Sequence, residues 1–172
     1  MNNDNNKGLK VYNLLVQKYF ISEKFLLTFA YRKLNMVYIT RKEHFCAAHK
    51  LYNKHWSPEE NNKVFGKCAS PNFHGHNYEI YVTIKGKVNP DSGFVINLFE
   101  LSDILKHDVV ELLDHKNLNL DIEYFKTQLP SIENLSVFIW NLITEKIKRT
   151  GAQLHCIKIQ ETENNFAEYY GE

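Results

Sequence analysis

Apolar and polar positions alternate over two segments of the chain, and this alternation is typical of β-strands. In residues 37–49, one parity carries Val37, Ile39, Phe45, Ala47 and His49. Arg41 and Glu43 interrupt this inward row, so we expect a bulge or an exposed stretch there. In residues 74–85, the apolar row consists of Tyr78, Ile80, Val82 and Ile84. The sequence therefore predicts two strands, each with one buried face.

Two later segments have apolar residues at the three- and four-residue spacing of a helix. The first covers residues 98–113, and the second begins after the N-cap candidate Ser131 and ends before Gly151. Residues 154–162 and 166–170 predict two further strands joined by an Asn-Asn turn. The order β-β-α-α-β-β predicts an α+β fold, in which an antiparallel sheet carries two helices on one face.

Residues 1–35 and 50–71 fall outside this pattern. The first segment opens with the Asn-rich run MNNDNNK and has six Lys or Arg against two Asp or Glu. A targeting peptide and an extension outside the core both fit this composition, and we favour the extension, with translation starting at Met36. Residues 36–172 then form one globular domain. Residues 50–71 are polar and contain turn signals, which predicts a long loop between two strands. We call this loop the excursion; loops of such length often carry functional residues.

The composition is that of an ordinary globular protein, with 44% hydrophobic and 24% charged residues in a chain of 172. The formal net charge of +1 does not indicate the excess of Lys and Arg that is typical of proteins that bind nucleic acids. No apolar run reaches the roughly 20 residues that a membrane span needs, so we expect no membrane partner. Three cysteines without a CxxC pair fit a reducing compartment, the cytoplasm. Cys46 and Cys156 are expected to be small buried hydrophobes.

Three histidines are candidates for a metal site. His74 and His76 open the second strand, where residues two apart point to the same face, and His49 ends the first strand in phase with its inward residues. If these strands are antiparallel neighbours, the three imidazoles converge at one end of the sheet. Three His without a fourth protein ligand is the pattern of a catalytic zinc site with an open position. The alternative is that HxH occurs by chance and that these histidines are core residues.

Cys68 lies in the excursion just before the second strand and outside any periodic apolar segment. A cysteine near a divalent ion or a cationic residue becomes a thiolate, which can abstract a proton beside a carbonyl or carbinol. We therefore interpret Cys68 as a catalytic base. The alternative is that Cys68 is a fourth zinc ligand, which would make this a non-enzymatic, zinc-stabilised module.

Four carboxylate or imidazole residues are further candidates. Asp114 and His115 follow the first helix, and such a pair is the usual second half of a Cys-His relay, although a capping Asp and a surface His fit equally well. Glu161 shares the inward parity of its strand, where a carboxylate is costly unless paired, so it is a candidate for binding an amidine-like edge of a substrate. Glu133 is a second candidate for substrate binding, with interaction with the helix dipole as its alternative.

Four motifs occur together in one known enzyme family. They are FCAAHKLY (45–52), FGKCASPNFHGHNY (65–78), LDHKNL (113–118) and QET (160–162). Together they closely resemble the 6-pyruvoyl-tetrahydropterin synthase family, over roughly residues 38–172 in one register. Phe73 departs from the family pattern, where a small residue is common. Ser131-Ile132 also departs, because it replaces a pair of threonines near the pterin pocket.

The resemblance implies the tunnelling fold, in which subunits form a barrel of trimers and two trimers stack into a hexamer. It implies conversion of 7,8-dihydroneopterin triphosphate to 6-pyruvoyl-tetrahydropterin with loss of triphosphate, in tetrahydrobiopterin biosynthesis. The positions that match the zinc ligands are His49, His74 and His76. Cys68 matches the proton-abstracting cysteine, Asp114 and His115 match its partners from a neighbouring subunit, and Glu161 matches the carboxylate that anchors the pterin.

A related family is the nearest rival. The 6-carboxytetrahydropterin synthases of the queuosine pathway usually have three residues between the cysteine and the HGH motif. This sequence has five residues between Cys68 and His74, which favours the pyruvoyl enzymes.

Overall fold

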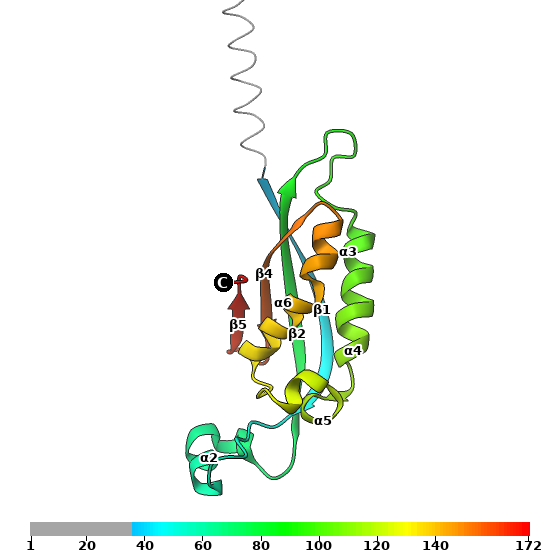
Figure 1. Cartoon of the computed structure of the whole chain (residues 1–172). Coiled ribbons are helices and arrows are strands. Elements are labelled where there is room, and N and C mark those ends of the chain that lie inside the picture. The colour runs from blue at the N-terminus through cyan, green and yellow to red at the C-terminus, as the bar shows by residue number, and fades with distance from the viewer. Residues whose placement is uncertain (1–35) are drawn as a thin grey trace, which may run out of the picture. The chain divides into compact units, whose positions relative to one another are not determined.

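One mixed sheet of five strands, in the order β3-β1-β2-β4-β5, forms the frame of the molecule (Figure 1). The computed structural model describes residues 36–172, and the extension predicted for residues 1–35 lies outside this range. The strands are β1 (Met36–His49), β2 (His74–Lys87), β3 (Lys116–Asn117), β4 (Gln153–Gln160) and β5 (Phe166–Tyr169). All but β3 lie where the alternation of the sequence predicts them.

The prediction of a purely antiparallel sheet is wrong at one edge. β4 is antiparallel to both β2 and β5, but β3 is parallel to β1 and pairs Ala47 with Lys116. The backbone N–H of His115 donates to the carbonyl oxygen of Cys46 (2.6 Å), which holds this segment beside the end of β1. A strand of two residues is too short to give an alternating pattern, so the sequence contains no signal for it.

The predicted order β-β-α-α-β-β and the α+β class are confirmed, with short helices added between these elements. The first predicted helix consists of α3 (Leu98–Leu105), a π-turn (η2, Lys106–Val110) and α4 (Glu111–Leu113), and the second is α6 (Ile132–Arg149). Ser131 caps α6 as predicted and accepts from the backbone N–H of Asn134 (3.4 Å). The remaining helices are α2 (Pro58–Phe65), η1 (Gly66–Ala69), α5 (Leu118–Asp121) and η3 (Glu123–Lys126).

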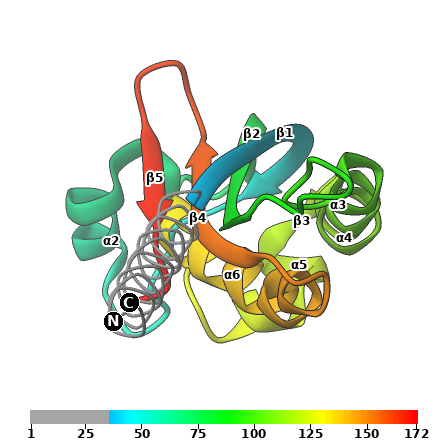
Figure 2. The same cartoon turned by 90° about the horizontal axis from the view of Figure 1, so that it is seen from above.

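The helices α3 and α6 cover one face of the sheet, so the core lies between two layers (Figure 2). Fully buried side chains come from both layers: Tyr78, Ile80, Val82, Ile157 and Ile159 from the strands, and Leu101, Leu105, Leu135, Ile139 and Ile143 from the helices. Each buried aliphatic side chain of this kind stabilises the fold by roughly 1.5–3 kcal/mol. Phe45 and Ala47 of β1 and Tyr78 of β2, close to the ends of these strands, are also buried in this core.

The interruption at Arg41 and Glu43 corresponds to a largely exposed first half of β1, in which these two side chains form an ion pair (2.8 Å). Of the two cysteines expected to be buried, Cys156 is buried, but Cys46 is exposed. Cys46 has the outward parity of β1, and this overrides the preference of free cysteines for the interior. Within residues 36–172, the structure contains no helix with the length and apolar character needed to cross a membrane.

Candidate active site

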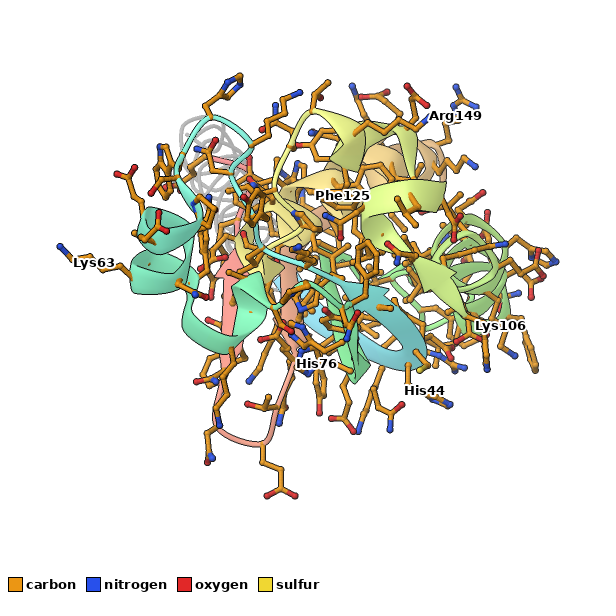
Figure 3. All side chains as sticks on the ribbon, turned by 90° about the horizontal axis from the view of Figure 1, so that it is seen from below. His44, Lys63, His76, Lys106, Phe125 and Arg149 are labelled. Carbon is orange, nitrogen blue, oxygen red and sulfur yellow. The ribbon has the colours of Figure 1, made fainter. Side chains whose placement is uncertain are left out.

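Three histidines lie together at the end of the sheet where β1 stops and β2 starts. The ligand nitrogen atoms of His49, His74 and His76 all lie within 4.8 Å of one another. The Nε2 atoms of His49 and His74 are 3.1 Å apart. Figure 3 views this end of the molecule and labels His76. The structure thus brings together the three imidazoles that the sequence placed on two neighbouring strands.

Burial keeps His49 neutral, and one hydrogen bond orients its ring. Its Nδ1 donates to the carbonyl oxygen of Pro130 (2.7 Å), so the lone pair of Nε2 faces His74. His49 is 1% exposed, and this burial lowers its pKa from the ordinary value of 6.5, against the smaller opposite effect of the bond to Pro130. Burial also lowers the pKa of His76. Both rings are therefore neutral at pH 7, which is the form that binds a metal ion.

Gly75 allows β1 and β2 to approach each other between the two ligands of β2. A Cβ atom at Gly75 would lie 3.2 Å from the carbonyl oxygen of Ala47 and 3.7 Å from the Cα of Ala48. Any side chain here would push the strands apart. The absence of a side chain at Gly75 therefore keeps His49 close to His74 and His76.

Glu161 lies beside the histidines, at the end of β4. Its Oε1 is 3.4 Å from the Nε2 of His49 and 3.6 Å from the Nε2 of His76. The strand ends earlier than predicted, at Gln160, so Glu161 opens the turn to β5 and its backbone N–H donates to the carbonyl oxygen of Asn165 (3.1 Å). This backbone bond fixes where the carboxylate leaves the main chain.

Tyr78 holds the same carboxylate from the core. Its hydroxyl donates to the Oε1 of Glu161 (3.5 Å), and the ring is fully buried. Burial, followed by the negative charge of Glu161, raises the pKa of Tyr78, so the hydroxyl stays protonated and remains a donor. Tyr78 therefore sets the position of one carboxylate oxygen, and the described residues make no hydrogen bond to the other.

A cavity of about 420 Å³ opens beside the histidines, and four of the eight predicted site residues line it. It is lined by His49, Leu51, Cys68, Ser131, Ile132, Glu133, Glu161, Asn164, Asn165 and Phe166. Cys68 comes from η1, Glu133 from the first turn of α6 and Glu161 from the turn after β4. Among residues 36–172, the cluster able to hold a metal contains the three histidines without Cys68. The geometry thus gives no support for Cys68 as a fourth ligand.

Asp114 and His115 form a pair that lines a different cavity, together with Cys46 and Lys106. The Asp114 carboxylate accepts from the backbone N–H of Cys46 and from the Nδ1 of His115, both at 2.8 Å, and these bonds, the first more than the second, lower the pKa of Asp114. The helix ends at Leu113, as predicted, and Asp114 is its C-cap. His115 takes a φ of 56°, and its side chain is 83% exposed. The described residues that line this cavity do not include Cys68.

Sequence reasoning missed five residues that shape this site. The carbonyl oxygen of Pro130 orients His49 from 81 residues away, and no side-chain pattern signals a backbone contact of this kind. Tyr78 was assigned only to the core, although a buried Tyr hydroxyl needs a partner and therefore indicated a polar group nearby. Asn164, Asn165 and Phe166 were interpreted only as a turn and the start of a strand, but they also line the cavity.

The donor set suits a divalent transition metal. Neutral imidazole nitrogen atoms are preferred ligands of zinc and its neighbours in the periodic table. The Nε2 of His49 carries no hydrogen and points at the Nε2 of His74. The Nδ1 of His74 is buried and has no hydrogen-bond partner among the described residues. The three histidines could therefore hold a metal ion.

Comparison with known proteins agrees with these features. The family model described as 6-pyruvoyl tetrahydropterin synthase matches residues 38–172. A 6-pyruvoyl tetrahydrobiopterin synthase of Dictyostelium discoideum is 47% identical over 79% of this chain and 97% of its own length, and the Homo sapiens protein of that name is 42% identical over 78% and 91%. The solved structure of Caenorhabditis elegans 6-pyruvoyl tetrahydropterin synthase superposes with a TM-score of 0.75 at 35% identity, over 80% of this chain and 96% of that chain. The chain therefore belongs to the 6-pyruvoyl tetrahydropterin synthase family.

Proposed function

We propose that this protein converts 7,8-dihydroneopterin triphosphate to 6-pyruvoyl-tetrahydropterin with elimination of triphosphate, in tetrahydrobiopterin biosynthesis. The observation that carries this proposal is a single cavity lined by a metal-capable histidine, the Cys68 thiol and the Glu161 carboxylate. Residues 36–172 would be the catalytic domain and residues 1–35 an extension outside it. We also propose the cytoplasm as its location, because Cys46, Cys68 and Cys156 are all free thiols.

His49, His74 and His76 would hold a zinc ion. When bound, the zinc would polarise the hydroxyl groups of the substrate and acidify the protons on the adjacent carbon atoms. The protein's own part is to present neutral ring nitrogens: Pro130 fixes the ring of His49, and Gly75 keeps the two strands close.

Cys68 would be the base. As a thiolate it would take the proton of a C–H bond in the three-carbon substituent of the substrate, and the electron pair of that bond would move towards the neighbouring carbon as the C–O bond to triphosphate breaks. Asp114 and His115 of a neighbouring subunit would exchange the proton with Cys68, because the pair in the same subunit lines another cavity. The pair is preorganised for this by the backbone N–H of Cys46, which orients Asp114.

Glu161 would anchor the pterin ring through the amidine-like edge of that ring, which presents two N–H donors to a carboxylate. Glu133 at the start of α6 would be a second contact. No Lys or Arg is among the described residues that line this cavity, and two are carboxylates. The triphosphate would therefore point out of the cavity towards cations elsewhere in the assembly.

The site would be complete only in an oligomer. Among the described residues, both edges of the sheet leave strands unpaired within one subunit: β5 on one side and, beyond the short β3, most of β1 on the other. Pairing of these edges between subunits would close the barrel of the tunnelling fold, as a trimer, and two trimers would form the hexamer. This arrangement would bring Asp114 and His115 to the cavity of a neighbour.

The variant Cys68→Ala tests the proposal. We expect it to keep its metal and its fold and to lose most turnover, because the thiol lies outside the histidine cluster. If the variant loses the metal and unfolds, the site is structural and the proposal fails.

A further inference from the structure

The excursion between β1 and β2 is closed at its base next to Cys68. The backbone N–H of Leu51 donates to the carbonyl oxygen of Cys68 (3.0 Å), and both residues line the cavity. Between these residues the excursion forms α2, which lies apart from the sheet and the core helices (Figure 1) and packs mainly on η1. The side chain of Lys63 projects from α2 away from the molecule (Figure 3). Cys68 is therefore held by a segment that rests little on the core.

One buried polar side chain organises this excursion. Asn61 of α2 is 0% exposed. Its Nδ2 donates to the carbonyl oxygens of Asn53 (2.9 Å), Trp56 (3.3 Å) and Ser57 (3.0 Å), and its Oδ1 accepts from the backbone N–H of Asn53 (2.7 Å). The amide group thus uses both of its hydrogen atoms and its oxygen. Each of these contacts is to the backbone of the turn that enters α2.

A continuous helical segment connects Asn61 to Cys68. Phe65, one turn after Asn61, stacks on Trp56 with a ring separation of 5.7 Å and an interplanar angle of 16°. Helix η1 begins at the next residue, Gly66, and contains Cys68 two positions later. Asn61 thus joins the entry turn to α2, and the stack of Trp56 on Phe65 joins the same turn to the residue that precedes η1.

We propose that Asn61 is a positioning residue that fixes the thiol of Cys68 at the cavity. This rests on the proposed role of Cys68 as the base. The described hydrophobic core cluster contains no residue from 50–73, where Ala69 is the one buried apolar side chain, so we expect Asn61 to act on the excursion more than on the fold of the domain.

The first test measures the accessibility of the thiol without any substrate. Asn61→Ala and the control Asn62→Ala, which alters an exposed neighbour in the same helix, are labelled with iodoacetamide, and the rate at Cys68 is compared with that at exposed Cys46 by mass spectrometry. We expect the ratio to rise on the order of tenfold in Asn61→Ala, because the excursion opens locally, and to stay at the wild-type value in Asn62→Ala. Metal content and melting temperature should stay close to wild type in both variants. An unchanged ratio, or loss of metal or fold in Asn61→Ala, would overturn the proposal.

The second test uses turnover of 7,8-dihydroneopterin triphosphate. Asn61→Ala should lower kcat on the order of 10- to 100-fold with little change in KM, since displacement of a catalytic group by about 1 Å has such an effect. In the Cys68→Ala background, Asn61→Ala should cause no further loss, because the thiol it positions is gone. A further loss there would show that Asn61 acts by another route. If the wild-type protein has no turnover, the proposed function fails, while the labelling ratio still decides the role of Asn61.

Discussion

The Nε2 atoms of His49 and His74 face each other at 3.1 Å across the first two strands of the sheet. The Nδ1 of His49 donates to Pro130, so its Nε2 has a lone pair directed at the second ring. The tautomer of His74 decides the nature of this contact: with its hydrogen on Nε2, His74 donates to His49, and with its hydrogen on Nδ1, both rings present lone pairs to one point. In the second case the two nitrogen atoms could hold a metal ion together, and the first two predictions follow from that arrangement.

Removing one ligand should abolish tight metal binding. We expect His74→Ala to lower zinc affinity by well over 100-fold, since loss of a residue that merely supports a ligand already costs roughly 10- to 100-fold. The measurement is zinc per subunit after dialysis against a weak chelator. His107→Ala is the matched control, because His107 is exposed on η2 and should leave about one zinc per subunit. Equal zinc content in the two variants would refute the assignment.

The metal-free protein should lose stability in mild acid. Burial lowers the pKa of His49 and of His76 below their ordinary value of 6.5, so below pH 6.5 the unfolded state binds more protons than the folded one. The part of the free energy of unfolding that depends on these two histidines should therefore be at its full value above about pH 7.5. It should decrease as the pH falls through 6.5 towards the pKa of the folded state. Urea unfolding of the metal-free protein at several pH values measures this. The slope should flatten in His49→Gln/His76→Gln, and an equal slope in that variant would assign the acid sensitivity to other groups.

Glu161→Gln should impair substrate recognition and spare the metal. The substitution keeps the shape of the side chain and removes the charge that an amidine-like edge would pair with, so we expect kcat/KM to fall roughly 10- to 100-fold, in line with about 1.5–3 kcal/mol for a hydrogen bond to a charged group. Zinc content should not change. Glu163→Gln, at an exposed position of the same turn, is the control. An equal fall in kcat/KM in Glu163→Gln would contradict the proposal that Glu161 binds the substrate.

Two inactive variants should restore activity when their subunits are mixed. Asp114 and His115 line a different cavity from Cys68 within one subunit, so we expect each working site to combine two subunits. Cys68→Ala and His115→Ala, unfolded and refolded together in equal amounts, should regain about a quarter of wild-type activity by random pairing across one interface. The separately refolded variants give the baseline. A mixture no more active than that baseline would place the relay within one subunit.

The sequence predicts the parts of this fold that repeat a pattern. The inward row of β1, ending at His49, and the row of β2 that starts at Tyr78 are read directly from period two, and the cap at Ser131 marks the start of α6. The same periods place His74 and His76 on one face. Elements without a period were not predicted, such as α2 in the excursion and the two-residue β3.

The missing features of the site have a common physical cause. They depend on contacts between segments far apart in the sequence, for example Pro130 with His49 and Tyr78 with Glu161. Neither contact follows from local propensity, since a carbonyl oxygen is present at every residue and a Tyr in a strand is ordinary. Residue types indicated the chemistry of the site, whereas only the fold shows which groups orient it.

The identity of the product is the measurement that tests the proposed function most directly. Zinc-loaded protein is incubated with 7,8-dihydroneopterin triphosphate, and the pterin and the released phosphate species are identified by mass spectrometry. We predict 6-pyruvoyl-tetrahydropterin and one equivalent of inorganic triphosphate, both lost in Cys68→Ala. Formation of 6-carboxytetrahydropterin, or recovery of unchanged substrate, would contradict the proposed function.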